Sequence, residues 1–201
     1  MRLSKTPEVY QKKDIYEKLS NGILFPKEKV WFILSDNGKA NKMISAAATT
    51  KQFSYRNHES HKCRYSHMSR FGKVAKMLDI SNLKIQITID NKFLSPDGAY
   101  GVYLVFRFCD PKISSRNRMY MNLKYKSGTE TLHSYFGIQR DEDWMMIELC
   151  RFLNHKEDVS FMFLLESFSR YYCPSGAIYI EGIEFRAIKN ASLIKTLWFS
   201  F

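Results

Sequence analysis

The sequence lacks several features that would assign a protein to a class at once. No apolar stretch approaches the length of a membrane span, and no hydrophobic segment of a secretion signal follows Met1. The four cysteines lie far apart and form no Cys-x-x-Cys pair. We therefore expect no membrane partner, reduced thiols, and a location in the cytoplasm, the nucleus or both.

Catalytic motifs are also missing. The chain contains no phosphate-binding loop, no Gly-x-Gly-x-x-Gly and no Gly-x-Ser-x-Gly. Asp141, Glu142 and Asp143 adjoin Arg140 at an expected turn, where solvated charges are usual. These observations predict that the protein is not an enzyme, has no catalytic residues and uses no cofactor.

Negative charge is comparatively scarce: 20 Asp and Glu face 31 Lys and Arg, which gives a net charge of +11. Such a surface attracts polyanions. The cations are scattered, however, with no run of five or more. We therefore interpret them as a solvated basic surface rather than as a nucleic-acid site.

Hydrophobic periodicity predicts mainly β-structure, which the 15% aromatic content also favours. Ile15 and Leu19 have the spacing of a short helix, and residues 68–78 have that of an amphipathic helix. Residues 49–67 are mostly polar and predict a loop. Strands are expected at Lys29–Leu34, Lys42–Ala48, Leu83–Ile89, Tyr103–Phe108, Met119–Tyr125, Trp144–Leu149, Val159–Leu165 and Ile178–Phe185.

The expected strands, with turn signals between them and no helix after residue 78, predict an antiparallel sandwich of two sheets. In the last strand, Ile178 and Ile180 occupy even-numbered positions, whereas Ile183 and Phe185 occupy odd-numbered positions, so the apolar face of the strand changes between them. This switch predicts a β-bulge at Gly182.

A histidine-rich segment raises the question of a metal site. His58, His61, Cys63 and His67 are residue types that bind zinc. Their spacing matches neither His-Glu-x-x-His nor a zinc-finger pattern, and Lys62 adds positive charge beside the thiol. We interpret them as polar loop residues and expect no metal.

The expected loop contains three aromatic residues, Phe53, Tyr55 and Tyr65. They could either bind a sugar or anchor the loop. Rings stack on the apolar face of a sugar, while polar side chains such as Arg56 and Asn57 pair with its hydroxyls. The same rings could instead anchor the loop to the sheet. Composition alone favours anchoring.

Five segments, in this order and spacing, resemble the plant phloem protein 2 family of Nictaba-related lectins: Val74–Leu78, Leu94–Tyr100, Val102–Phe106, Asp143–Leu149 and Gly182–Arg186. The resemblance implies a mostly β, jelly-roll-like antiparallel β-sandwich, here with the short N-terminal helix and the amphipathic helix expected above. We accordingly divide the chain into a polar extension over 1–27, a lectin domain over 28–188 and an apolar tail over 189–201.

The N-terminal part carries a further resemblance. Lys12–Leu19, Trp31–Leu34 and Lys42–Ala46 are similar to the linker found in F-box members of this family. Only about a dozen residues precede Lys12. We therefore expect either a family member without an F-box or a truncated chain, and no direct docking onto a ubiquitin-ligase scaffold.

The family implies binding of N-acetylglucosamine oligomers or N-glycan cores, carried by glycans or glycoproteins. Its sugar-binding tryptophan positions fall near Phe53, on Cys63 and Tyr65, and near Tyr172, and its C-terminal acid falls near Glu166. The resemblance thus predicts a carbohydrate-binding site of Phe53, Tyr65, Glu166 and Tyr172, in which rings stack on the sugar and the acid accepts hydroxyls.

The tryptophans of the family are replaced here by Phe53, Cys63 and Tyr65, which reduces the stacking surface. Losing one good platform costs on the order of 1 kcal/mol. The alternative is therefore a degenerate lectin fold that acts as a protein–protein interaction module. Its protein partner would bind the same loop or the apolar residues 191–201.

Overall fold

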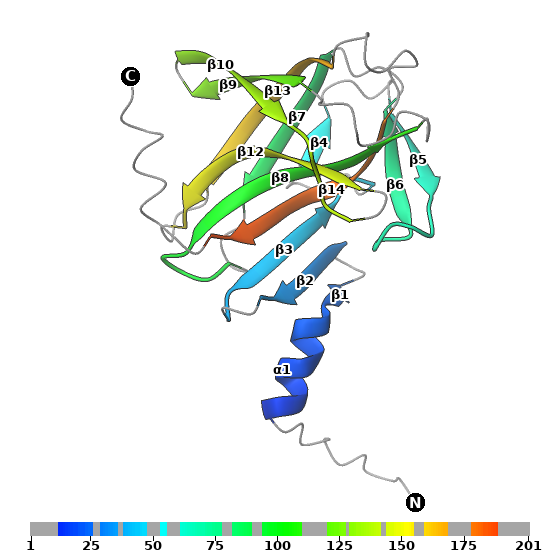
Figure 1. The fold of residues 1–201 in the computed structure, drawn as a ribbon, viewed down its shortest axis with the longest axis vertical. Coiled ribbons are helices and arrows are strands. Elements are labelled where there is room, and N and C mark those ends of the chain that lie inside the picture. Colours follow the sequence, from blue (N-terminus) through cyan, green and yellow to red (C-terminus); the bar gives the residue numbers. More distant parts are fainter. Residues whose placement is uncertain are drawn as a thin grey trace, which may run out of the picture.

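The computed structural model describes residues 12–25, 29–35, 38–47, 53–55, 61–77, 82–89, 94–109, 120–127, 129–141, 144–154, 159–168 and 178–188. Within them lie one α-helix, α1 (Lys12–Asn21), and fourteen β-strands (Figure 1). The short N-terminal helix predicted from Ile15 and Leu19 is confirmed. No helix of the described part has the length and hydrophobicity to cross a membrane.

The first sheet has nine strands, and all of its pairings are antiparallel. A hairpin of β5 (His61–Tyr65) and β6 (Lys73–Met77) joins it through β14. The main path runs, in order, through β1 (Ile23–Phe25), β2 (Val30–Leu34), β3 (Ala40–Ser45), β14 (Ile178–Ala187), β8 (Ala99–Phe108), β12 (Met145–Leu153) and β11 (Ile138–Gln139).

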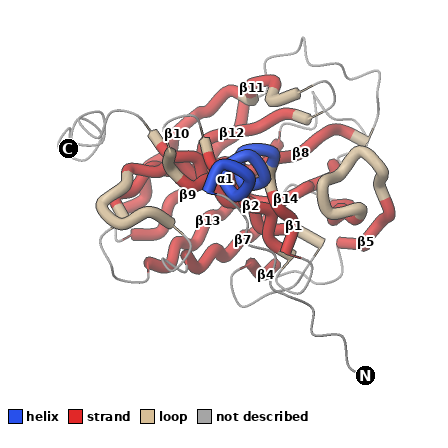
Figure 2. Tube along the Cα trace, turned by 90° about the horizontal axis from the view of Figure 1, so that it is seen from below, coloured by secondary structure: helices blue, strands red, loops and turns tan. Residues whose placement is uncertain are grey.

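The second sheet has five strands, also antiparallel. Their order is β10 (Thr129–Phe136), β9 (Tyr120–Ser127), β13 (Val159–Phe168), β7 (Asn82–Ile89) and β4 (Phe53–Tyr55). Seen from below, β12, β8 and β14 of the first sheet lie along one side, and β13, β7 and β4 along the other (Figure 2). The predicted two-layer antiparallel sandwich is confirmed.

The main hydrophobic core covers the inner face of the first sheet, which is turned toward the second sheet. On the central strand β8, alternate residues Tyr100, Val102, Leu104 and Phe106 are completely buried in it. Val105, between them, is buried on the opposite, outer face. A strand buried on both faces has no polar alternation, which is why its sequence is a continuous apolar run.

Two β-bulges reverse the facing of residues along their strands. In β14 the register with β8 shifts between Ile180 and Gly182, so that Glu181 is the extra residue. The bulge predicted at Gly182 is confirmed. A Cβ on Gly182 would overlap the carbonyl oxygen of Ile44, so only glycine fits where β14 meets β3. In β12 a second shift lies between Glu148 and Cys150.

The amphipathic helix predicted over residues 68–78 is wrong. Residues 66–72 form a hydrogen-bonded turn, in which Ser66 N donates to Gly72 O at 3.0 Å, and β6 follows. Val74 and Ala75 are both fully buried, one in each core cluster. Because both faces of β6 are covered, its apolar residues mimicked helical spacing.

The loop predicted over residues 49–67 is also wrong in part, since β4 and β5 fall within it. Both strands are short, and β4 has only three residues. Strands of this length carry too few alternating positions for a pattern to be visible.

Candidate binding face

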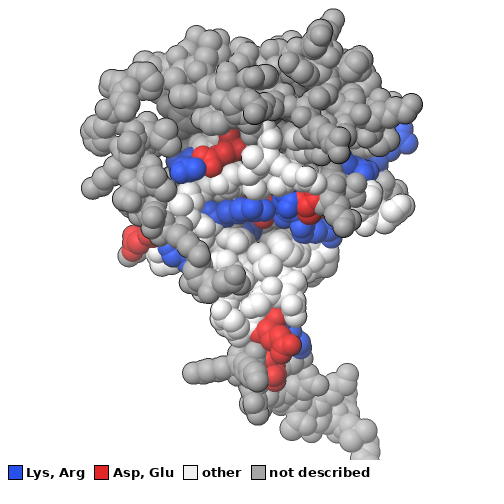
Figure 3. Space-filling model, in the orientation of Figure 1, with Lys and Arg blue, Asp and Glu red and all other residues white. Residues whose placement is uncertain are grey.

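The outer face of the first sheet carries Lys and Arg side chains close to Asp and Glu side chains (Figure 3). Aromatic side chains lie on the same face. Two groups lie on it. The arginine–carboxylate network consists of Arg70, Arg140, Asp141, Glu181, Glu184 and Arg186. The cation–ring row consists of Lys76, Tyr179, Arg107 and Trp144.

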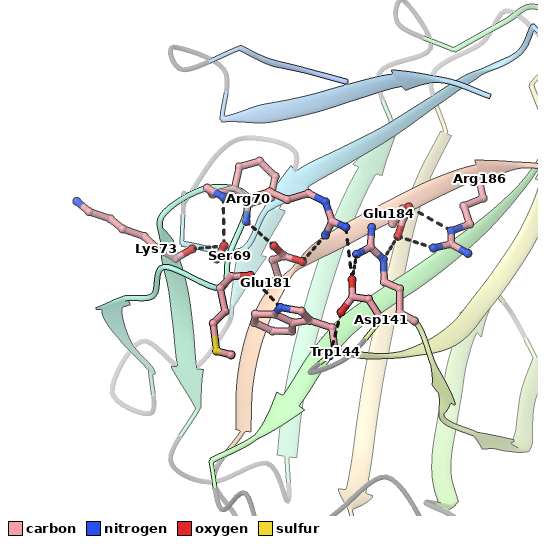
Figure 4. A network of polar contacts seen from close by, with 11 residues as sticks. Ser69, Arg70, Lys73, Asp141, Trp144, Glu181, Glu184 and Arg186 are labelled. Carbon is pink, nitrogen blue, oxygen red and sulfur yellow. Dashed lines mark hydrogen bonds and ion pairs between the residues drawn. The ribbon is translucent and has the colours of Figure 1, made fainter. Parts of the chain in front are cut away.

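The network begins at the bulge of β14. Glu181 is the extra residue there, and its carboxylate lies on the outer face, where it is completely buried. The backbone N of Arg70 donates to it at 2.7 Å, and the guanidinium donates at 3.0 Å (Figure 4). Burial raises the pKa of Glu181, and the charge and hydrogen bonds of Arg70 only partly oppose this.

The centre of the network is the pair of Arg140 and Glu184, joined at 2.7 Å, with side chains only 5% and 6% exposed. Asp141 pairs with Arg140 at 2.8 Å, and Arg186 pairs with Glu184 at 3.1 Å. Burial acts to raise the pKa of Glu184, but Arg140 and then Arg186 outweigh it and lower the pKa. The expectation that Arg140 belongs to a solvated turn is therefore wrong.

Aromatic side chains beneath this network are covered. Trp144 is 3% exposed, and its Nε1 donates to the carbonyl of Met68 at 3.1 Å, which fixes the turn of residues 66–72 over the face. The guanidinium of Arg70, in the same turn, lies 5.1 Å from the centre of the Trp31 ring. The Trp144 indole is therefore closed to a ligand, and the half-buried Trp31 ring is partly covered by Arg70.

Beyond the network, Tyr103 links β8 to β12. Its hydroxyl donates to Glu148 at 2.9 Å, and Arg151 donates to the same carboxylate at 2.7 and 3.0 Å. Burial, followed by the charge of Glu148, raises the pKa of Tyr103 to about 12. The ring lies against Gly101, where a Cβ would come within 2.7 Å of it. These contacts stabilise the pairing of β8 with β12.

The cation–ring row runs across three adjacent strands. Tyr179 on β14 is the register partner of Lys76 on β6 and of Arg107 on β8. The Lys76 ammonium lies 5.8 Å from the centre of the Tyr179 ring, and the Arg107 guanidinium lies 5.0 Å from it. The same guanidinium lies 5.3 Å from the Trp144 ring centre. Cations at these distances are attracted by the ring face.

The four predicted carbohydrate-binding residues are spread over both sheets. Tyr65 ends β5 in the first sheet, and Phe53 and Glu166 lie on β4 and β13 of the second. Phe53 pairs with Ile87 of β7 and Glu166 with Asn82, roughly 17 Å apart along that strand. Tyr172 lies outside the described residues, as do His58 and the side chains of His61 and Cys63. The four-residue site stays a prediction.

Within the described part of the chain, no group of three or more His, Cys, Asp and Glu side chains could hold a metal ion. His67 is exposed, at the turn that follows β5.

A family model described as phloem protein 2 matches residues 39–187. The chain belongs to the phloem protein 2 family. The match spans the strands from β3 to the last residue of β14, and therefore both sheets of the sandwich.

Two curated phloem protein 2 relatives are F-box proteins of Arabidopsis thaliana. The chain is 25% identical over 221 aligned residues to F-box protein PP2-B13, covering 88% of this chain and 76% of that protein. To a second F-box protein it is 28% identical over 141 residues, covering 61% of this chain and 44% of that protein.

Solved structures of similar shape include carbohydrate-binding modules. The phloem protein 2 chain is 8% identical to a family 35 module of Cellvibrio japonicus, with a TM-score of 0.44, covering 73% of this chain and 92% of that one. For a xylan-binding module of Paenibacillus barcinonensis the identity is 8% and the TM-score 0.42, covering 70% and 94%. Both scores lie below 0.5, and we infer no ligand from them.

One motif of the phloem protein 2 resemblance has a structural explanation. In Leu94–Tyr100, the turn is closed by Gly98 N donating to Ser95 O at 3.3 Å, and Asp97 has a φ of 55°. The Tyr100 hydroxyl accepts from Ser95 N at 2.9 Å, and Asn154 donates to Ser95 O at 3.0 Å. The motif therefore fixes the entry into β8.

The cation–ring row was missed by sequence reasoning. Lys76, Tyr179 and Arg107 are far apart in the chain, and only strand pairing brings them together. One signal was available: residues 61–77 hold five Lys and Arg and no Asp or Glu.

Proposed function

We propose that this phloem protein 2 chain is a non-catalytic carbohydrate-binding module located in the cytoplasm or nucleus. Its ligands would be N-acetylglucosamine oligomers or N-glycan cores. The observation that carries the proposal is the family match across residues 39–187, which covers both layers of the sandwich. The predicted contacts are stacking by Phe53, Tyr65 and Tyr172 and hydroxyl pairing by Glu166.

The carboxylates of the outer face support a non-catalytic role. A general acid or base must reach the proton that it transfers. Glu181 is completely buried and held by Arg70, and Glu184 is bound by Arg140 and Arg186. Both carboxylates are thus engaged in the fold. Incubation with N-acetylglucosamine oligomers should leave their chain lengths unchanged.

A glycan array on the full chain tests the proposal. Binding should concentrate on N-acetylglucosamine oligomers and N-glycans. Phe53→Ala should weaken it by about fivefold or more, because a stacking ring is worth on the order of 1 kcal/mol. Phe25→Ala is the matched control, since Phe25 is 44% exposed on β1, outside the family match.

If the folded protein binds no glycan on the array, the proposal is rejected. In that case the alternative of a protein–protein interaction module gains support, and a stoichiometric protein partner becomes the object to identify. An equal loss of binding in the Phe25 and Phe53 variants would instead reject the assignment of Phe53.

A further inference from the structure

Lys76 and Arg107 flank one aromatic ring and have no acidic partner among the residues that the structure describes. Both cations are held near Tyr179, at 5.8 and 5.0 Å from its centre. In the described part of the chain, neither forms an ion pair with a carboxylate, whereas Arg70, Arg140, Arg151 and Arg186 on the same face all do. Two like charges that share a ring repel each other, and an anion between them would relieve that repulsion.

The Arg107 guanidinium keeps unused donors. It has five N–H groups, and within the described residues its one side-chain hydrogen bond runs from Nη1 to the Met68 sulfur at 3.0 Å, a weak acceptor. The buried Nε has no hydrogen-bond partner among the described residues. Trp144 and Tyr179 hold the planar group in place. A fixed guanidinium with free N–H groups suits the two oxygens of a carboxylate or sulfate.

The surroundings are cationic as well. Residues 61–77 form the β5–β6 hairpin and contain no Asp or Glu. Lys62 is the register partner of Lys76, which extends the line of cationic positions to β5. Arg64 is exposed on the same strand. Positive charge concentrated in one hairpin raises the local concentration of anions.

We propose that the cation–ring row binds an anionic group, a carboxylate or sulfate, on an acidic oligosaccharide. This inference rests on the proposed function, in that the ligand is a glycan. Single-stranded nucleic acid fits less well, because base stacking needs an open ring face. Here Trp144 is 3% exposed, and two cations already lie beside Tyr179.

Calorimetric titration of the full chain at physiological salt tests the row directly. The probes are an oligogalacturonide, its fully methyl-esterified and therefore neutral form, and a sulfated oligosaccharide. At least one acidic probe should bind, and esterification should weaken oligogalacturonide binding at least tenfold if the carboxylate is the group bound. Binding of only the sulfated probe would assign the row to sulfate. Failure of both acidic probes would overturn the proposal.

Two variants locate the site. Lys76→Gln and Arg107→Gln should each weaken binding of the acidic probe about tenfold, the effect of losing one charge-assisted contact. Arg151→Gln is the matched control: it makes the same charge change on the same face, at the pair with Glu148, and should leave affinity unchanged. Equal losses in all three variants would mean general charge attraction and overturn the proposal.

The Lys76 variant keeps the test valid if Arg107→Gln unfolds, because the Lys76 side chain has no hydrogen bond or ion pair in the described part of the chain. A single-stranded 20-mer of uridylate that competes as tightly as the acidic glycan would also overturn the proposal. Binding of an N-acetylglucosamine oligomer is measured in parallel. If the N-acetylglucosamine oligomer binds and the acidic probes do not, only the proposal for the cation–ring row is rejected. If an acidic probe binds and the N-acetylglucosamine oligomer does not, the predicted N-acetylglucosamine site is rejected.

Discussion

In the centre of the outer face Arg140 lies between two carboxylates, whereas at one end Arg107 lies between two aromatic rings. In the centre, three arginines meet three acids, so the charges cancel and the donors are used. At the end, no described carboxylate pairs with Arg107, and most of its N–H donors have no partner among the described residues. The same side chain therefore serves the stability of the fold in one place and remains available to a ligand in the other.

The comparison is tested most strongly by Arg140→Gln. This change would leave the buried Glu184 with Arg186 alone and Asp141 with Arg70 alone. Breaking a buried ion pair costs about 3 kcal/mol, so the free energy of unfolding should fall by that amount. Urea denaturation measures it. Arg151→Gln, in a more exposed pair, should cost less than about 1 kcal/mol, and equal effects would contradict the comparison.

Gly182→Ala tests the bulge that places Glu181 in the network. An added methyl would overlap the backbone of Ile44, which cannot move without disturbing β3, so we expect a loss of about 2 kcal/mol or more. Gly137→Ala is the control, because there the nearest atom is the flexible end of Met145 at 3.0 Å. Thermal unfolding of both variants gives the comparison. A smaller loss at Gly182 would show that the bulge is not required.

The two buried glutamates should respond to pH in opposite directions. The pKa of Glu184 is lowered from its ordinary 4.5, so its contribution to stability is present above pH 4.5 and is lost as pH falls through the folded-state pKa. The pKa of Glu181 is raised, so its contribution is present below pH 4.5 and is lost as pH rises through the folded-state pKa.

Denaturation from about pH 7 to about pH 3 separates the two glutamates. Glu184→Gln should reduce the loss of stability on acidification, and Glu181→Gln should increase it. Parallel curves for the wild-type protein and both variants would show that neither pKa is shifted by the network.

A smaller effect on stability than at Arg140 is expected at the end of the face. Arg107→Gln removes two cation–ring contacts and no ion pair, so the free energy of unfolding should fall by about 1 kcal/mol. Measured beside Arg140→Gln, the same substitution should thus cost about a third as much. A loss as large as that at Arg140 would assign Arg107 to the fold rather than to binding.

Periodicity in the sequence predicted those parts of the fold in which one face of a strand differs from the other. The parity change around Gly182 located the bulge, and the apolar run of 103–108 indicated the strand buried on both faces. The helix prediction over residues 68–78 was wrong because the two faces of the strand found there do not differ. Val74 and Ala75 are buried on opposite faces of β6, so alternation was hidden there.

The outer face could not be predicted, because its pairs join distant residues. Arg70 and Glu181 are 111 positions apart, and nothing near either residue indicates the other. The closeness of Arg140 to Asp141–Asp143 in the sequence led to a wrong prediction for Arg140. Adjacent charges suggested solvent, whereas Arg140 reaches Glu184 on another strand. The predicted ring-bearing site rested on the family resemblance together with the aromatic residues of the expected loop.

β14 has a consequence for how the protein is made. Along one edge it pairs first with β6 and then with β3, and along the other with β8. β3 and β6 therefore have no partner along one edge until β14, which is translated more than a hundred residues later, is available. During synthesis their edges stay unpaired until residue 187 leaves the ribosome, and in that interval a chaperone would have most to protect.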